Sequence, residues 1–148
     1  MSYQHLEQHQ RHLHRLQHLQ SICGWDQAAM MPAGGNEARA EALAELEVLI
    51  HQKLTAPEVA DWLAAAATEP LSADQQANLR EFRRNWQNAS LIPSALVEAQ
   101  SLAASRCEHA WRSQRKLNDW AGFAVNLKQV VSLSREVATG STPSGFGS

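Results

Sequence analysis

Apolar residues recur every three or four positions in six successive segments of this 148-residue chain, and this spacing constrains the fold most. It places apolar side chains on one face of an α-helix. The pattern is clearest over residues 120–137, where it follows i, i+3, i+4 and i+7 steps. Strong helix formers dominate and β-branched residues are scarce, which argues against a sheet. We therefore predict an all-α fold of about six helices in an antiparallel, bundle-like array.

The expected helices are separated by short polar or proline-containing breaks. They cover residues 3–24, 36–54, 57–67, 73–89, 94–117 and 120–138. Four polar residues are expected to cap helix N-termini: Thr55, Ser72, Ser94 and Asp119. Two of these, Thr55 and Ser72, also have the glutamate or glutamine of a capping box three residues later. Residues 1–138 are expected to form one helical domain, and the Gly-, Ser- and Pro-rich segment 139–148 a flexible tail.

Length and charge limit the classes of function. A domain of this size is expected to bury about 70% of the surface that its unfolded chain exposes. A net charge of −2 gives no electrostatic reason to expect a nucleic acid or an anionic membrane as partner. The chain has no apolar run of the ~18 residues that a membrane span needs, and it starts without a secretory signal. Two cysteines, Cys23 and Cys107, do not make a disulfide framework, so we expect a cytoplasmic protein.

Five histidines crowd the first expected helix. His5, His9 and His12 share one face, and His14 and His18 share another, at spacings that can bind zinc, nickel or copper weakly. Structural zinc sites usually need four ligands, which these faces do not supply. We therefore interpret the histidines as solvated side chains beside the apolar stripe and predict no metal site.

An arginine cluster and the serines and cysteines are two further candidates for functional sites. Arg80, Arg83 and Arg84 lie beside aromatic residues of the fourth segment, but a solvated face with local ion pairs, such as one to Glu81, explains them better than nucleic-acid binding. The serines and cysteines lie in helical segments without an evident base and acid, so nucleophilic catalysis has little support. No catalytic residue is predicted from these groups.

The stretch between the first two helices differs from both in composition. It begins at Trp25 and reads WDQAAMMPAGGNEARAE. Pro32 fixes φ and disfavours helix in the residue before it, and Gly34 and Gly35 allow backbone angles closed to other residues. The residues therefore predict a structured turn that re-aims the chain. The stretch as a whole resembles the N-terminal signature of the carboxypeptidase Taq family of zinc metallocarboxypeptidases.

The resemblance continues in order along the chain to about residue 138. The matching residues are Leu54-Thr55, Asn78-Leu79-Arg80-Glu81, Arg83-Arg84, Pro93, Leu96-Val97-Glu98, Ala110-Trp111, Asn118-Asp119, Leu127, Val130-Val131 and Arg135-Glu136. The chain departs from the family at Val125-Asn126, where a proline is expected soon after the alanine. It also departs in the Gly/Ser/Pro segment at its end, where family members continue with further helices.

The resemblance implies an enzyme several times longer than this chain. Such an enzyme would have a largely helical fold around a deep groove and would release C-terminal amino acids from peptides. Its zinc would sit on a His-Glu-x-x-His helix with a downstream glutamate, the first glutamate activating the metal-bound water. No histidine of this chain is followed by glutamate, so the resemblance implies neither a catalytic residue nor a bound cofactor here.

The resemblance also implies two candidates for the substrate groove, Trp25 and Asp26. The residues by themselves leave an alternative open, in which Trp25 belongs to the core and Asp26 is a cap. For the whole chain we consider two hypotheses. It is the N-terminal region, or a truncated form, of a metallocarboxypeptidase and is inactive alone, or it is a stand-alone helical binding or assembly module.

Apolar stripes left uncovered by a missing part of an enzyme would favour association. The expected partners are therefore a second copy of the chain or a separately encoded catalytic portion. Peptide substrates are expected only for the full-length enzyme.

Overall fold

A computed structural model describes residues 1–140 and confirms the all-α prediction, since this range contains six α-helices and no strand. The helices are α1 (Ser2–Ala29), α2 (Asn36–Leu54), α3 (Pro57–Ala66), α4 (Ala73–Ser90), α5 (Ser94–Lys116) and α6 (Trp120–Gly140), and a short 3-10 turn, η1 (Ala33–Gly35), precedes α2. The last helix ends two residues beyond the expected position. The rest of the predicted tail, residues 141–148, lies outside the described residues.

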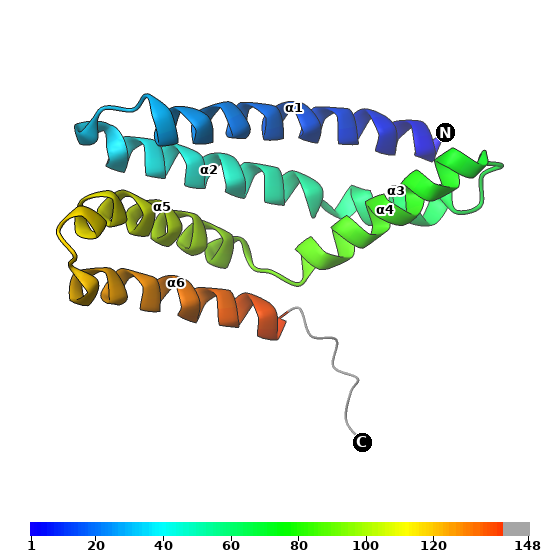
Figure 1. Ribbon diagram of the computed structural model, residues 1–148. Helices are drawn as coiled ribbons and strands as arrows, with labels where there is room; N and C mark the ends of the chain where they lie inside the picture. Colours follow the sequence, from blue (N-terminus) through cyan, green and yellow to red (C-terminus); the bar gives the residue numbers. More distant parts are fainter. Residues whose placement is uncertain (141–148) are drawn as a thin grey trace, which may run out of the picture.

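The helices form an open layer. Figure 1 shows α1, α2, α5 and α6 side by side, with α3 and α4 at one end. The most extensive contacts join α2 to α5 and α5 to α6, followed by those of α1 with α2 and α3. Neighbours in the layer run antiparallel, as predicted, but the layer does not close into a barrel-like bundle. In the described range no helix is long and apolar enough to span a membrane.

The best-buried core lies where the first half of α1 meets α3 and α4. Its buried members are Tyr3, Leu6, Val59, Leu63, Ala66 and Leu79. Trp62, Phe82 and Trp86 pack against this cluster from the outside. The sequence predicted these α3 and α4 stripes, because their apolar residues recur at three- and four-residue steps.

The sequence predicted one apolar stripe along the whole of α1, and this prediction is wrong for the second half of the helix. Leu6 and Leu13 are buried, but Leu19 is 53% exposed and Ile22 is 49% exposed. An α-helix turns about 100° per residue, so residues spaced repeatedly by three drift around the helix. Ile22 lies nine residues after Leu13, which is about half a turn away, so it points to the opposite side.

Two of the four predicted caps are confirmed. Ser72 Oγ accepts a hydrogen bond from the Gln75 backbone N–H at 3.3 Å, and Gln75 Oε1 accepts one from the Ser72 backbone N–H at 2.9 Å, which completes the capping box. Asp119 Oδ1 accepts from the Gly122 backbone N–H at 2.9 Å. The other two caps are wrong. The Thr55 hydroxyl donates back to the His51 carbonyl, and Ser94 Oγ lies 3.2 Å from His51 Nδ1.

Gly122 is the residue whose replacement tests the start of α6. A Cβ at this position would overlap with Asp119 Oδ2 and lie 2.9 Å from Gln114 Nε2. Gly122→Ala is therefore expected to displace the Asp119 cap, a loss of about 1 kcal/mol that offsets the similar gain in helix propensity, so the free energy of unfolding measured with urea should stay nearly unchanged.

Gly24→Ala is the matched control, because no atom lies within 4 Å of a Cβ added there. It is expected to raise the free energy of unfolding by about 0.5–1 kcal/mol through helix propensity alone. Equal stabilisation by the two substitutions would contradict the overlap at Gly122.

The chain exposes more surface than its mass predicts. Its accessible area is 9817 Å², whereas a compact monomer of 16.4 kDa exposes roughly 7,500 Å². Eight residues in any conformation, the number outside the described range, add at most about 1,000 Å². Folding therefore buries roughly 60% of the unfolded surface, so the expectation of 70% is wrong, because the layer is open.

Candidate functional site

α1 continues to Ala29, five residues beyond its expected end, so both groove candidates, Trp25 and Asp26, lie at the end of this helix, just before the turn to α2. Pro32 adopts an extended conformation (φ −60°, ψ 149°), as its sequence context predicted, and η1 then leads into α2. The predicted reason for the glycines is wrong, because neither Gly34 nor Gly35 has a positive φ. Gly35 instead provides space, since a Cβ there would lie 3.2 Å from Met31 Cγ. The turn is shaped by close packing, and its backbone angles are ordinary.

Asp26 forms an ion pair across this turn. Its Oδ2 lies 2.7 Å from Nη2 of Arg39, and both side chains are about 30% exposed. The Asp26 carbonyl also accepts from the backbone N–H groups of Met30 and Met31, at 2.9 and 2.8 Å. The carboxylate therefore links the last turn of α1 to the first turn of α2, and it does not cap a helix N-terminus.

Trp25 lies beside this ion pair but faces outward. It is 61% exposed, so the alternative that places it in the core is wrong. Met30, at the end of α1, is 65% exposed. The end of α1 thus presents two large apolar side chains to its surroundings, and the Asp26–Arg39 pair ties this end of the helix to α2.

A second ion pair anchors the start of α2 to α5. Glu37 Oε1 lies 2.5 Å from Nη2 of Arg106, and both side chains are exposed. The hydrogen bond and the positive charge of Arg106 lower the pKa of Glu37, and the same contact raises the pKa of Arg106. Both acidic partners, Asp26 and Glu37, belong to the signature stretch, and in this structure both have structural contacts.

The histidines of α1 divide into two groups. The rings of His5 and His9 lie 5.8 and 5.6 Å from the ring of Trp62, and His9 Nε2 lies 2.9 Å from the Lys53 carbonyl oxygen. The prediction that all are solvated is therefore incomplete, because His9 helps to join α1 to α2 and α3. His12, His14 and His18 are exposed.

A zinc site does not fit the residues present. Among residues 1–140, no three His, Cys, Asp or Glu side chains lie close enough together to hold a metal ion. The sequence also lacks a histidine followed by glutamate. We therefore derive no catalytic step through zinc from the residues of this chain.

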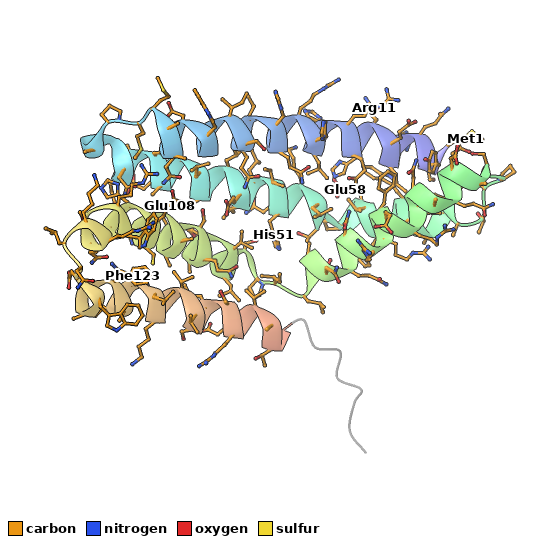
Figure 2. All side chains as sticks on the ribbon, in the orientation of Figure 1. Met1, Arg11, His51, Glu58, Glu108 and Phe123 are labelled. Carbon is orange, nitrogen blue, oxygen red and sulfur yellow. The ribbon has the colours of Figure 1, made fainter. Side chains whose placement is uncertain are left out.

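His51 joins three helices in an arrangement that the sequence did not reveal. Its Nε2 lies 3.0 Å from the Ala89 carbonyl oxygen at the end of α4, and its Nδ1 lies 3.2 Å from Ser94 Oγ at the start of α5 (Figure 2). Because a carbonyl oxygen only accepts, neutral His51 carries its proton on Nε2 and accepts from the Ser94 hydroxyl at Nδ1. The contacts are 38 and 43 residues apart in sequence, so spacing could not predict them.

The surroundings of Cys107 do not favour a nucleophilic thiolate. Both Cys23 and Cys107 are free. Cys107 is buried in α5, and burial raises the pKa of its thiol, which keeps it protonated at neutral pH.

Comparison with known proteins identifies relatives of the whole described region. The model of the carboxypeptidase Taq (M32) metallopeptidase family matches residues 5–144. Thermostable carboxypeptidase 1 of Thermus thermophilus is 36% identical over 141 residues, which are 93% of this chain and 28% of that protein. Thermostable carboxypeptidase 1 of Pyrococcus furiosus is 29% identical over 129 residues, which are 86% of this chain and 26% of that protein.

Solved structures show the same arrangement of helices. Trypanosoma cruzi metallocarboxypeptidase 1 superimposes with a TM-score of 0.75 at 33% identity, over 98% of this chain and 29% of that one. The structure of a Pyrococcus furiosus carboxypeptidase gives a TM-score of 0.76 at 25% identity, with the same coverage. The chain thus spans less than a third of the length of these relatives.

Proposed function

This chain belongs to the carboxypeptidase Taq (M32) metallopeptidase family, and we propose that it is the N-terminal helical region of a zinc metallocarboxypeptidase. The match of the family model to residues 5–144 carries the proposal. In such an enzyme, which releases C-terminal amino acids from peptides, the zinc ligands and the catalytic glutamate would come from residues outside this chain. The chain itself would supply scaffold and part of the groove wall.

The packing of α6 supports this role. In the described residues α6 packs mainly on α5, and none of its residues is buried. Its apolar stripe, which includes Phe123, Leu127 and Val130, is only half-covered, although it has the clearest helical spacing in the sequence. An apolar stripe with such regular helical spacing normally faces a protein core. We propose that the catalytic portion of the enzyme, in the same polypeptide or separately encoded, covers it.

The exposed Trp25 supports a contribution to the groove. A large aromatic side chain at 61% exposure is available to contact a peptide or the catalytic portion. Asp26 acts differently in this proposal, because Arg39 already pairs with its carboxylate. Asp26 is thus a positioning residue that ties the end of α1, from which Trp25 projects, to α2.

The open layer also favours the second candidate, an assembly module that acts without chemistry. The accessible area exceeds that of a compact monomer by roughly 1,300 Å² after the eight undescribed residues are allowed for. Specific interfaces bury about 1,200–2,000 Å² in total, so the excess is large enough for a homodimer. A sedimentation-velocity experiment that gives a monomer at all concentrations would count against this candidate.

We also propose a cytoplasmic location. Cys23 and Cys107 are both free, which suits a reducing compartment. Recovery of the protein in a secreted or periplasmic fraction of its source cells would contradict it.

The purified chain is expected to have no peptidase activity, with or without added zinc. The physical reason is that no three potential ligands lie together in residues 1–140. The measurement is release of C-terminal amino acids from unblocked peptides, with a full-length family enzyme as positive control. A zinc-dependent release by the chain alone would contradict the proposal.

Formation of a complex gives a positive test of the scaffold role. The part of the Thermus thermophilus relative that this chain does not match is expected to bind the chain on co-expression. Replacing Leu127 and Val130 of α6 by lysine should abolish the complex. Complex formation that survives these substitutions would show that the α6 stripe is not the docking surface.

A further inference from the structure

A groove of about 660 Å³ opens among α1, α2, α5 and α6, and it reaches Gly24 and Gln27 near the end of α1. We call it the polar groove. Its polar lining includes Gln20, Gln27, Glu47, Ser101, Ser105 and Glu108, and Gly24 and Ala104 keep it open. Its volume lies within the range of about 300–1,000 Å³ that is typical of ligand sites.

Three side chains that line the groove are buried yet have no hydrogen-bond partner among the described residues. Gln27, Ser101 and Ser105 are only 7, 8 and 9% exposed. Their polar atoms are not sealed off, in contrast to Asn36 Oδ1, which is buried without a partner. Hydroxyl and amide groups both donate and accept, so these three side chains favour a ligand that does the same, as a peptide backbone does.

The charge of the groove favours a cation. Its lining contains Glu47 and Glu108 but no lysine, arginine or histidine. Arg112 Nη2 pairs with Glu108 Oε1 at 2.9 Å and also donates to the Gln27 carbonyl, so Glu108 (Figure 2) is partly neutralised. Glu47 accepts a neutral hydrogen bond from Gln20 Nε2 at 3.0 Å, and no cationic side chain of the described residues pairs with it. A cleft lined by one sign of charge attracts ligands of the other sign.

The polarity of the groove follows from the rotation of the apolar stripe around α1. In the second half of this helix, Leu19 and Ile22 point outward, and Gln20, Gly24 and Gln27 point toward α2 and α5. The polar side chains that α1 contributes to the groove are therefore encoded in its sequence, and Leu43 and Val130 add apolar lining from α2 and α6. A metal ion is a poor candidate ligand, because no third ligand accompanies the two glutamates.

We propose that the polar groove binds a short, extended peptide segment that carries a lysine or arginine side chain. Backbone groups of the peptide bond to Gln27, Ser101 and Ser105, and the cationic group lies against Glu47. This inference does not depend on the zinc chemistry proposed above, because every residue that it uses belongs to this chain.

Fluorescence anisotropy of the 148-residue chain tests the proposal. The probe is a fluorescein-labelled pentapeptide with a central lysine, and the control is the same peptide with acetyllysine. Glu47→Gln removes the charge but keeps an oxygen that accepts from Gln20, and it is expected to weaken binding of the lysine peptide about tenfold. Glu45→Gln makes the same charge change on α2 but outside the polar groove, and it should leave the affinity unchanged.

Gly24→Leu separates loss of binding from loss of folding. Gly24 lines the polar groove, and no atom lies within 4 Å of a Cβ added there, so we expect a leucine side chain to occupy groove space while the helices keep their positions. Replacing a helical glycine by leucine should also raise Tm. A variant that is more stable but no longer binds the peptide would support the proposal.

Three results would overturn it: no binding of the lysine peptide, equal binding of the lysine and acetyllysine peptides, or unchanged binding by both Glu47→Gln and Gly24→Leu. Displacement of the peptide by an equal concentration of spermidine would also overturn it, because a simple amine would then suffice.

Discussion

Replacing Leu6 by alanine is expected to lower the free energy of unfolding by about 3–5 kcal/mol, the largest effect of any single substitution considered. Leu6 is 0% exposed and lies in the cluster that joins α1 to α3 and α4. Removing its side chain leaves a cavity in a core that has few other fully buried side chains, Val59 being the other large one. Such a loss is a large fraction of the 5–15 kcal/mol that is typical of a domain. Urea unfolding followed by circular dichroism measures it.

Leu19→Ala is the matched control, because it makes the same chemical change on the same helix. Leu19 is 53% exposed, so its replacement should cost less than about 1 kcal/mol. Equal losses for the two variants would mean that the second half of α1 also buries its leucines, contrary to the rotation seen in the structure.

Ala40→Leu is expected to cost about 1–3 kcal/mol, the second-largest effect, through overpacking. Ala40 is 0% exposed on α2, the helix that contacts both α1 and α5. A leucine there has no space unless the helices move apart. The same unfolding measurement applies, and a smaller affinity for the lysine peptide should accompany the loss, since α1, α2 and α5 also form the polar groove.

Ala38→Leu provides the control within the same signature stretch. Ala38 is exposed, and leucine is a good helix former, so stability should change by no more than about 0.5 kcal/mol. If Ala38→Leu destabilised the protein as much as Ala40→Leu, the loss would come from the local sequence and not from packing between helices.

These predictions change the interpretation of the signature stretch. Asp26 and Arg39 pair across the turn, Gly35 makes room for Met31, and Ala40 allows the helices to approach. Each of these residues shapes the antiparallel connection between α1 and α2. Within the signature stretch, the exposed Trp25 and the groove-lining Gln27 are the candidates for contact with a peptide.

The sequence by itself determined the helical class, the approximate extent of the helices, two of the four expected caps and the family. These features depend on local spacing and on motifs within a few residues, such as Ser72 with Gln75. It could also show that the His-Glu-x-x-His motif is absent, because that motif is contiguous.

Only the tertiary structure decided which side of α1 faces inward, how Asp26 and Glu37 are paired, and that His51 joins three helices. Each residue of an α-helix adds about 100° of rotation. Apolar residues spaced repeatedly by three instead of 3.6 therefore reach the opposite side of the helix within about three turns. The partners of Glu37 and His51 lie tens of residues away, at distances set by how the helices pack. The polar groove depends both on the rotation of α1 and on helix packing, because its lining residues come from four helices that must first pack together.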